Sequence, residues 1–249
     1  NIFYVYNAGF PIRDESYDWQ YVLKGNSSET LWSTYLEFDN LPQLLNPESG
    51  FIQNCNSSPF QTTIGEDNPK IDDFSKTMGI EETMTNRALR ALETFGKDDK
   101  ITYDEFKEYK YDLKYSENSS MFYHVSKAIE ILSNSDNFSE ISENTINAAL
   151  KIFKEWDLFT DKDNIHASLP IIAFSRMLSE NPQNISDGII VEKISSAIEY
   201  LMSNYNQLDV RWGDVNRLIR GDKNIELSGG PDVPRAIYSK RMENGQLKG

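Results

Sequence analysis

Apolar residues in this 249-residue chain recur with a helical period over residues 83–206 but not before them. Apolar side chains three or four positions apart share one face of a helix, which packs against a core. We expect these faces to bury against one another in a helical layer or bundle. The predicted faces are Met84, Ala88, Leu89, Leu92 and Phe95; Met121, Val125, Ala128, Ile129 and Leu132; Ile146, Ala149, Leu150, Phe153 and Trp156; Ile171, Ile172, Phe174, Met177 and Leu178; and Ile190, Val191, Ile194, Ala197, Ile198, Leu201, Met202 and Tyr205.

Short extended runs replace the helical period near the start of the chain. Ile2 to Tyr6 is β-branched and aromatic, and Phe51 to Gln53 is a second apolar run that leads into a turn. Both have the composition of short strands. The sequence therefore predicts an α+β fold, with a few strands at the N-terminal end and a predominantly helical middle.

Three segments follow from this change of pattern. Strands and loops occupy residues 1–80, a helical region occupies residues 81–208, and residues 209–249 are charged and contain glycines. We predict that the last segment is extended and that residues 239–249 fray, as chain ends commonly do.

The charge balance excludes some classes of partner. The chain has 39 acidic and 25 basic residues and a formal charge of −14, whereas nucleic acids and anionic lipids attract basic surfaces. No run approaches the roughly 20 apolar residues of a membrane span. Cys55 is the only cysteine, so no internal disulfide can form. We interpret it as a small buried side chain, because no histidine accompanies it in a recognisable catalytic motif.

Several features resemble metal or cofactor motifs without completing one. Residues 96–106 resemble the end of a calcium-binding EF-hand loop, but aligning Glu105 with position 12 places Asp99 where glycine is required. Thr102 and Glu105 fit a helix-capping box better. Asp72 and Asp73 lack ligand spacing, and no glycine-rich phosphate loop is present. We therefore expect no cofactor and no metal site.

The two histidines are isolated in the sequence. His124 lies beside an apolar helix face and His166 lies in a polar stretch, and neither has a second ligand at zinc-binding spacing. We interpret His124 as a structural residue at the edge of the core.

Asn54 and Asn56 are the strongest candidates for chemistry. They are two residues apart at the end of the Phe51–Gln53 run, which would place both amides on one face of a strand. A fixed amide N–H is a neutral donor suited to a developing oxyanion. The alternative is an ordinary turn, because asparagine, serine and proline all favour turns.

Arg87 is the second candidate. It is expected in the first turn of a helix, where the helix dipole disfavours a cation. That position suggests a role other than helix stability. The alternative is an exposed helical charge of the kind that Arg90 and Glu93 would form as a pair.

Two groups of segments carry a resemblance to a known family. The first group is Asn1 to Arg13, Leu31-Trp32, Phe38 to Gln43, Asn46 to Asn56 and Thr85 to Ala88, and the second is Arg211 to Val215, Gly221-Asp222 and Ser228 to Pro231. In this order they resemble the β-subunit of the penicillin acylase family of N-terminal-nucleophile (Ntn) hydrolases. The branch they resemble most contains acyl-homoserine-lactone and cyclic-lipopeptide acylases.

The resemblance implies a fold and a mechanism. The fold is a four-layer αββα sandwich, with two sheets between helical layers. The α-amino group of an N-terminal serine acts as the base for that serine's own hydroxyl, which attacks the amide carbonyl. Asn56 takes the place of the oxyanion-hole asparagine, and Arg87 that of the arginine that orients this asparagine and the amino terminus.

The chain also departs from the family pattern. Asn1 stands where a strand interior of the β-subunit would be, no segment resembles the nucleophile region, and Asn216 replaces a histidine of many members. We therefore expect an internal fragment of a larger precursor, inactive without its partners: the nucleophile segment, the α-subunit and the C-terminal strands. The parent would hydrolyse acyl amides of the β-lactam, acyl-homoserine lactone or lipopeptide type, in the periplasm or outside the cell. The alternative is a non-catalytic helical structural or partner-binding domain of a degenerate acylase homologue.

Overall fold

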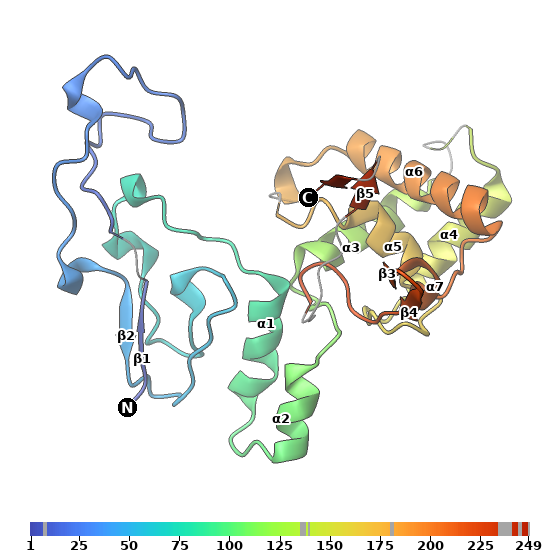
Figure 1. The fold of residues 1–249 in the computed structure, drawn as a ribbon, viewed down its shortest axis with the longest axis horizontal. Coiled ribbons are helices and arrows are strands. Elements are labelled where there is room, and N and C mark those ends of the chain that lie inside the picture. Colours follow the sequence, from blue (N-terminus) through green and yellow to red (C-terminus); the bar gives the residue numbers. More distant parts are fainter. Residues whose placement is uncertain are drawn as a thin grey trace. The chain divides into compact units, whose positions relative to one another are not determined.

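The structure is a computed structural model that describes all residues except 7–8, 135–137, 139, 180–181, 234–240, 244–245 and 249. The chain forms two compact units, an N-terminal unit (Asn1–Ile101) and a helical unit (Thr102–Gly249). Small antiparallel sheets and helices together are compatible with the predicted α+β class (Figure 1). The boundary between the two units reflects which residues pack together. The three predicted segments were instead defined by their expected secondary structure.

The N-terminal unit is built mainly from turns around one small sheet. Strands β1 (Phe3–Val5) and β2 (Gln43–Leu45) pair antiparallel, with Phe3 opposite Leu45 (Figure 1), which confirms the centre of the first predicted strand. Helix α1 (Asn86–Glu93) occupies part of the predicted 84–95 stretch. The short 3-10 turns of this unit are Ser28–Thr30, Phe38–Asn40, Pro59–Gln61, Ile71–Asp73, Lys76–Met78 and Phe95–Lys97.

The predicted strand over Phe51 to Gln53 is wrong. These residues belong to no strand, and the Gln53 N–H donates to the carbonyl of Thr62 at 2.8 Å. The Gln53 side chain then accepts from the Cys55 N–H at 3.0 Å. Polar side chains that bond to nearby backbone compete with a strand ladder, so this segment forms no strand.

Helices dominate the second unit. The predicted apolar faces at 121–132, 146–156 and 190–205 correspond to α3, α4 and α6, which confirms these helices. The fourth predicted face extends past Phe174, where its helix ends and a turn follows. The helices of this unit are α2 (Tyr103–Lys110), α3 (Ser120–Leu132), α4 (Glu143–Glu155), α5 (Ser168–Phe174), α6 (Asp187–Tyr205) and α7 (Trp212–Val215), with a 3-10 turn at Pro182–Asn184.

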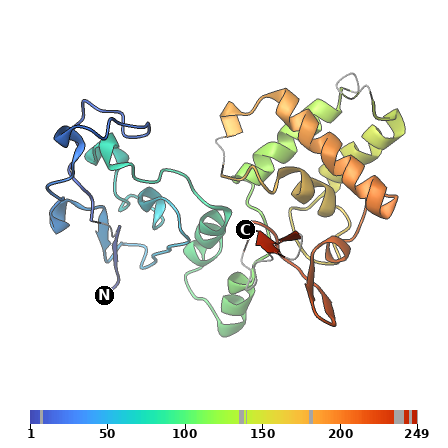
Figure 2. The ribbon, with the colours of Figure 1, turned by 45° about the horizontal axis from the view of Figure 1, so that its top comes forward.

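The core of the helical unit lies where α3, α5 and α6 meet. Helix α6 packs on α5 and α3, and α3 also packs on α4 (Figures 1 and 2). Leu169, Ile194 and Leu201 are fully buried there. His124 is also fully buried, with its ring centroid 5.3 Å from that of Phe174. It therefore lies inside the core, not at its edge as the sequence suggested.

The C-terminal segment is more structured than predicted. After α7, strands β3 (Arg217–Arg220) and β4 (Lys223–Glu226) form an antiparallel hairpin that projects from the helices (Figure 2). Gly221 has φ +59°, which the reversal between the strands requires and glycine adopts at little cost. Strands β5 (Arg241–Glu243) and β6 (Gln246–Lys248) also pair, so the expectation that the end frays is wrong for these residues.

The capping box at the start of α2 is present as predicted. The Thr102 hydroxyl accepts from the Glu105 N–H at 3.3 Å, and the Glu105 carboxylate accepts from the Thr102 N–H at 2.8 Å.

Among the described helices, none combines the length and apolar character that crossing a bilayer requires.

Candidate active site

Asn56 lies in a tight turn, not at the end of a strand. Its backbone is left-handed, with φ 57°, a conformation that asparagine adopts more readily than most residues. The Asn56 N–H donates to Oδ1 of Asn54 at 3.2 Å. The prediction of both amides on one strand face is therefore wrong: Asn54 supports the turn, and the Asn56 side chain is exposed beyond it.

Arg87 is brought to this turn by α1. The helix begins one residue before it, and Arg87 is half-buried in the first turn. Nη2 of Arg87 donates to Oδ1 of Asn56 at 3.2 Å, across 31 positions of sequence. The ordinary helical ion pair belongs to Arg90, whose Nη1 lies 2.7 Å from the Glu93 carboxylate.

The contact between Arg87 and Asn56 determines how the amide faces. A guanidinium has donors only, so it must bind the carbonyl oxygen of the asparagine and not its nitrogen. Oδ1 of Asn56 is thereby occupied and Nδ2 faces away. Within the described part of the chain, no hydrogen bond engages Nδ2 of Asn56. The arrangement presents a neutral N–H donor whose orientation is set by a cation.

Two further hydrogen bonds attach this turn to the segment that precedes α1. The Ser58 N–H donates to the Thr83 carbonyl at 3.2 Å, and the Thr85 hydroxyl donates to the Cys55 carbonyl at 3.0 Å. Thr83 and Thr85 of this segment, together with Arg87 of α1, therefore hold the turn at three positions. Cys55 is half-buried and not fully buried as expected.

A carboxylate and a buried amide flank these contacts. Hydrogen bonds from the hydroxyl and then from the N–H of Thr83 hold the pKa of Glu81 below its ordinary value, so Glu81 is ionised at neutral pH. The side chain of Gln53 lies in the interior, with 6% of the residue's surface exposed. Its Nε2 donates to the Gln61 carbonyl at 2.9 Å and to the Ser57 hydroxyl at 3.2 Å, which holds the turn from within.

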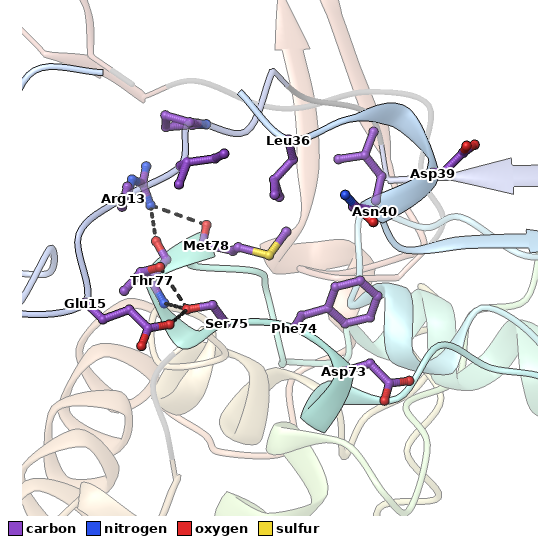
Figure 3. A pocket seen from close by; sticks show the side chains of 13 residues that line it. Arg13, Glu15, Leu36, Asp39, Asn40, Asp73, Phe74, Ser75, Thr77 and Met78 are labelled. Carbon is purple, nitrogen blue, oxygen red and sulfur yellow. Dashed lines mark hydrogen bonds between the residues drawn. The ribbon is translucent and has the colours of Figure 1, made fainter. Parts of the chain in front are cut away.

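A separate pocket of about 460 Å³ lies elsewhere in the N-terminal unit (Figure 3). Leu36, Phe74 and Met78 are among its apolar lining residues, and neither Asn56 nor Arg87 lines it. Its other lining residues are Pro11, Ile12, Arg13, Glu15, Asp39, Asn40, Leu41, Asp73, Ser75 and Thr77.

Arg13, which the sequence analysis did not single out, is the cation of this pocket. Its Nη1 donates to the Thr77 carbonyl at 2.7 Å, and the guanidinium lies 5.2 Å from the ring of Trp32 and 5.6 Å from that of Trp19. Figure 3 shows it bonded to the pocket wall. The tryptophans near it in sequence could have indicated a cation–π contact. In this position Arg13 holds its own segment against the segment that contains Thr77.

The second group of segments that resembles the acylase family begins at Arg211, and Arg211 belongs to a cluster of ion pairs. The Arg211 guanidinium contacts Asp163 and lies 3.2 Å from the Glu226 carboxylate, and Lys162 Nζ lies 3.6 Å from Glu226. Arg211 and then Lys162 hold the pKa of Asp163 below its ordinary value. Arg211 has the same effect on the pKa of Glu226. These contacts join α7, the loop before α5 and strand β4.

The remaining residues of this segment have structural contacts. Trp212 Nε1 donates to the Gly229 carbonyl at 2.7 Å. Asn216 Nδ2 donates to the carbonyls of Leu227 and Gly229 at 2.9 and 3.0 Å, which uses both hydrogens of the amide. The side chains of Trp212 and Asn216 therefore hold the segment that follows β4 in place through hydrogen bonds.

The surroundings of the two histidines are structural in the part of the chain that is described. His166 lies two residues before α5, with Nε2 3.6 Å from the Glu155 carboxylate, and His124 is enclosed in the core. In the part of the chain that the structure describes, no group of three histidine, cysteine or acidic residues is arranged to hold a metal ion.

Comparison with known protein families identifies the family of the chain. The profile of the family described as penicillin amidase matches residues 1–245, which includes the Asn56 turn, the start of α1 and the Arg211 segment. Members of this family hydrolyse amides and are processed from a precursor. Because the match covers nearly the whole sequence, the chain belongs to the penicillin amidase family.

Proposed function

We propose that residues 1–249 supply an oxyanion donor and its supporting arginine to an acylase that hydrolyses acyl amides. The observation that carries the proposal is the 3.2 Å hydrogen bond from Arg87 to Oδ1 of Asn56. It leaves Nδ2 of Asn56 as a fixed and outward-facing donor. An oxyanion hole needs such a donor, because a group oriented in advance need not reorganise as charge develops.

In this proposal the nucleophile is a serine outside residues 1–249, at the amino terminus of the mature subunit. Its α-amino group takes the hydroxyl proton as the oxygen attacks the amide carbonyl, and the carbonyl oxygen becomes an oxyanion that accepts from Asn56. As this intermediate collapses, the α-ammonium group gives the proton to the leaving nitrogen and the C–N bond breaks, which releases the amine and leaves an acyl-enzyme. Attack by water then releases the acid and restores the serine.

The finer features of the proposal come from the family resemblance. Residues 1–249 would form part of a four-layer αββα sandwich, completed by the nucleophile segment, the α-subunit and further strands, and would be inactive without them. The substrates would be acyl amides of the β-lactam, acyl-homoserine lactone or lipopeptide type, met in the periplasm or outside the cell.

Replacing Asn56 tests the proposal. Asn56→Ala in the full-length processed protein should lower kcat about 10²–10³-fold and leave KM nearly unchanged, because the lost contact forms only in the transition state. Asn147→Ala is the control, since Asn147 is an exposed residue of α4. A kcat within twofold of wild type for Asn56→Ala would refute the oxyanion assignment.

Arg87 is tested through its dependence on Asn56. Arg87→Leu alone should lower kcat, because the Asn56 amide is then free to rotate. If Arg87 acts by orienting Asn56, the same change in an Asn56→Ala background should have little further effect. Two independent, multiplicative losses would contradict that role.

N-terminal sequencing of the mature chains, purified without added protease, separates the proposal from its alternative. A chain that begins with serine before the segment described here supports self-processing. A single uncleaved chain without acylase activity would instead favour a non-catalytic helical structural or partner-binding domain of a degenerate homologue.

A further inference from the structure

The hydroxyl of Thr85 makes two hydrogen bonds with different consequences. It accepts from the Ala88 N–H at 3.2 Å, which caps the first turn of α1. It also donates to the carbonyl of Cys55 at 3.0 Å, 30 positions earlier in the chain. One side chain therefore joins the helix that carries Arg87 to the turn that carries Asn56.

The second bond acts on the peptide group that leads into Asn56. The Cys55 carbonyl and the Asn56 N–H belong to one rigid plane. Asn54 Oδ1 accepts from the N–H at one end of this plane at 3.2 Å, and Thr85 donates to the carbonyl at the other end. The plane is thus held on both sides.

Holding this plane matters because Asn56 has an uncommon backbone conformation. Its φ of 57° lies in the left-handed region, which a non-glycine residue leaves readily unless its surroundings retain it. If the plane rotated, the Asn56 side chain would move relative to Arg87. The 3.2 Å contact that orients the amide would then be lost.

We infer that Thr85 is a positioning residue for the oxyanion donor, acting through the Cys55–Asn56 peptide. The inference rests on the proposed function of Asn56. It assigns to Thr85 a role beyond capping α1. Misplacing a catalytic group by about 1 Å can cost on the order of 10²-fold in rate, so loss of this contact should reduce catalysis without removing any group that touches the substrate.

Thr102 offers a matched control, because it is an N-cap of the same residue type. Its hydroxyl accepts from the Glu105 N–H at 3.3 Å and donates to the Glu105 carboxylate at 2.6 Å. Both bonds join Thr102 only to the first turn of α2. Replacing Thr102 therefore removes a cap without disturbing the Asn56 turn.

Two substitutions remove the contact to Cys55 in different ways. Thr85→Val keeps the shape of the side chain and loses both hydrogen bonds. Thr85→Asp keeps an acceptor for the start of α1, since aspartate is a good N-cap, but an ionised carboxylate cannot donate to the Cys55 carbonyl. Thr85→Ser retains both bonds and is the conservative variant. If Thr85→Val fails to fold, Thr85→Asp still tests the inference.

The experiment measures kcat and KM of the full-length processed protein with acyl p-nitroanilides of graded chain length. We expect Thr85→Val and Thr85→Asp to lower kcat about 10- to 100-fold, with KM within about threefold of wild type. Thr85→Ser should stay within about threefold of wild type in kcat, and Thr102→Val should leave kcat unchanged. In an Asn56→Ala background, Thr85→Val should have no further effect.

The same series separates failure of this inference from failure of the proposed function. If Asn56→Ala lowers kcat at least 10²-fold but Thr85→Val and Thr85→Asp remain within twofold of wild type, Thr85 is only a helix cap and the inference is overturned. An equal loss in Thr85→Ser would also overturn it, because the hydroxyl would then not be the cause. If Asn56→Ala itself has no effect, the proposed function fails.

Discussion

Replacing Gly213 with alanine should destabilise the helical unit, although Gly213 lies in a helix, where alanine is normally preferred. The backbone of α7 passes very close to its neighbours at this point. A β-carbon at Gly213 would lie 2.9 Å from Cβ of Lys162, 3.0 Å from the Lys162 carbonyl oxygen and 3.2 Å from Cβ of Glu226. None of these three atoms can move without its backbone, because a carbonyl oxygen and a β-carbon have positions set by the main chain.

The expected magnitude follows from two opposing effects. Alanine in place of glycine in a helix stabilises by about 0.5–1 kcal/mol, whereas forcing an extra carbon into a packed site costs about 1–3 kcal/mol. The Gly213 N–H also donates to the Lys162 carbonyl at 2.7 Å, and moving α7 away would lengthen that bond. We expect a net loss of about 1 kcal/mol.

Gly188 provides the opposite case within the same unit. It lies in the first turn of α6, and a β-carbon there would meet only the Ser186 hydroxyl, at 4.0 Å. Gly188→Ala should therefore stabilise by about 0.5–1 kcal/mol. The two variants carry one chemical change and differ in the space around it.

Urea unfolding followed by ellipticity at 222 nm measures both variants. The signal reports mainly on the helical unit, which contains α2 to α7. With a slope of about 1–3 kcal/mol per molar urea, a 1 kcal/mol change moves the midpoint by about 0.3–1 M. Equal stabilisation by Gly213→Ala and Gly188→Ala would refute the close approach of α7 to Lys162 and Glu226.

Three further predictions concern the helical unit. Arg211 lowers the folded-state pKa values of Asp163 and Glu226, so their contribution to stability is complete above the unfolded values and disappears as pH falls through the folded ones. The urea midpoint should stay constant from pH 7 to about pH 5 and decline at lower pH. In Arg211→Gln this decline should be less steep. If the midpoint of that variant fell as steeply as that of wild type, the stabilising role of the ion cluster would be contradicted. Leu201→Ala should cost about 2–5 kcal/mol, because this side chain is fully buried, and a loss below 1 kcal/mol in urea unfolding would place Leu201 outside the core. Tyr115→Phe removes a 2.5 Å hydrogen bond to the Pro231 carbonyl and should cost about 1–2 kcal/mol in the same assay; an unchanged midpoint would contradict a stabilising contribution from this bond.

The local features of the fold were predictable because their causes lie within a few residues. The periods that predict α3, α4 and α6 place apolar side chains on one face whatever the rest of the chain does. The capping box of Thr102 and Glu105 spans a single turn. Residues whose backbone is bonded by nearby polar side chains were less predictable, and Phe51 to Gln53 form no strand for that reason.

The candidate site was predictable only as a set of residues. Asn56 and Arg87 were identified by residue type and family resemblance, yet the expected strand geometry around Asn56 was wrong. The contact between them spans 31 positions. It depends on where α1 begins and on how the turn is held by Thr83 and Thr85, and neither has a periodic pattern in the sequence.

By itself, then, the sequence determined the family, the principal helices and the residues that could carry chemistry. Periodicity and capping act over one or two helical turns, and they are written into consecutive residues. The tertiary structure alone decided that the Asn56 amide is oriented by Arg87, that Thr85 joins their two segments, and that Arg211 stands in an ion cluster with Asp163 and Glu226. Such contacts join residues far apart in the chain, and their geometry is fixed only when the intervening segments have packed.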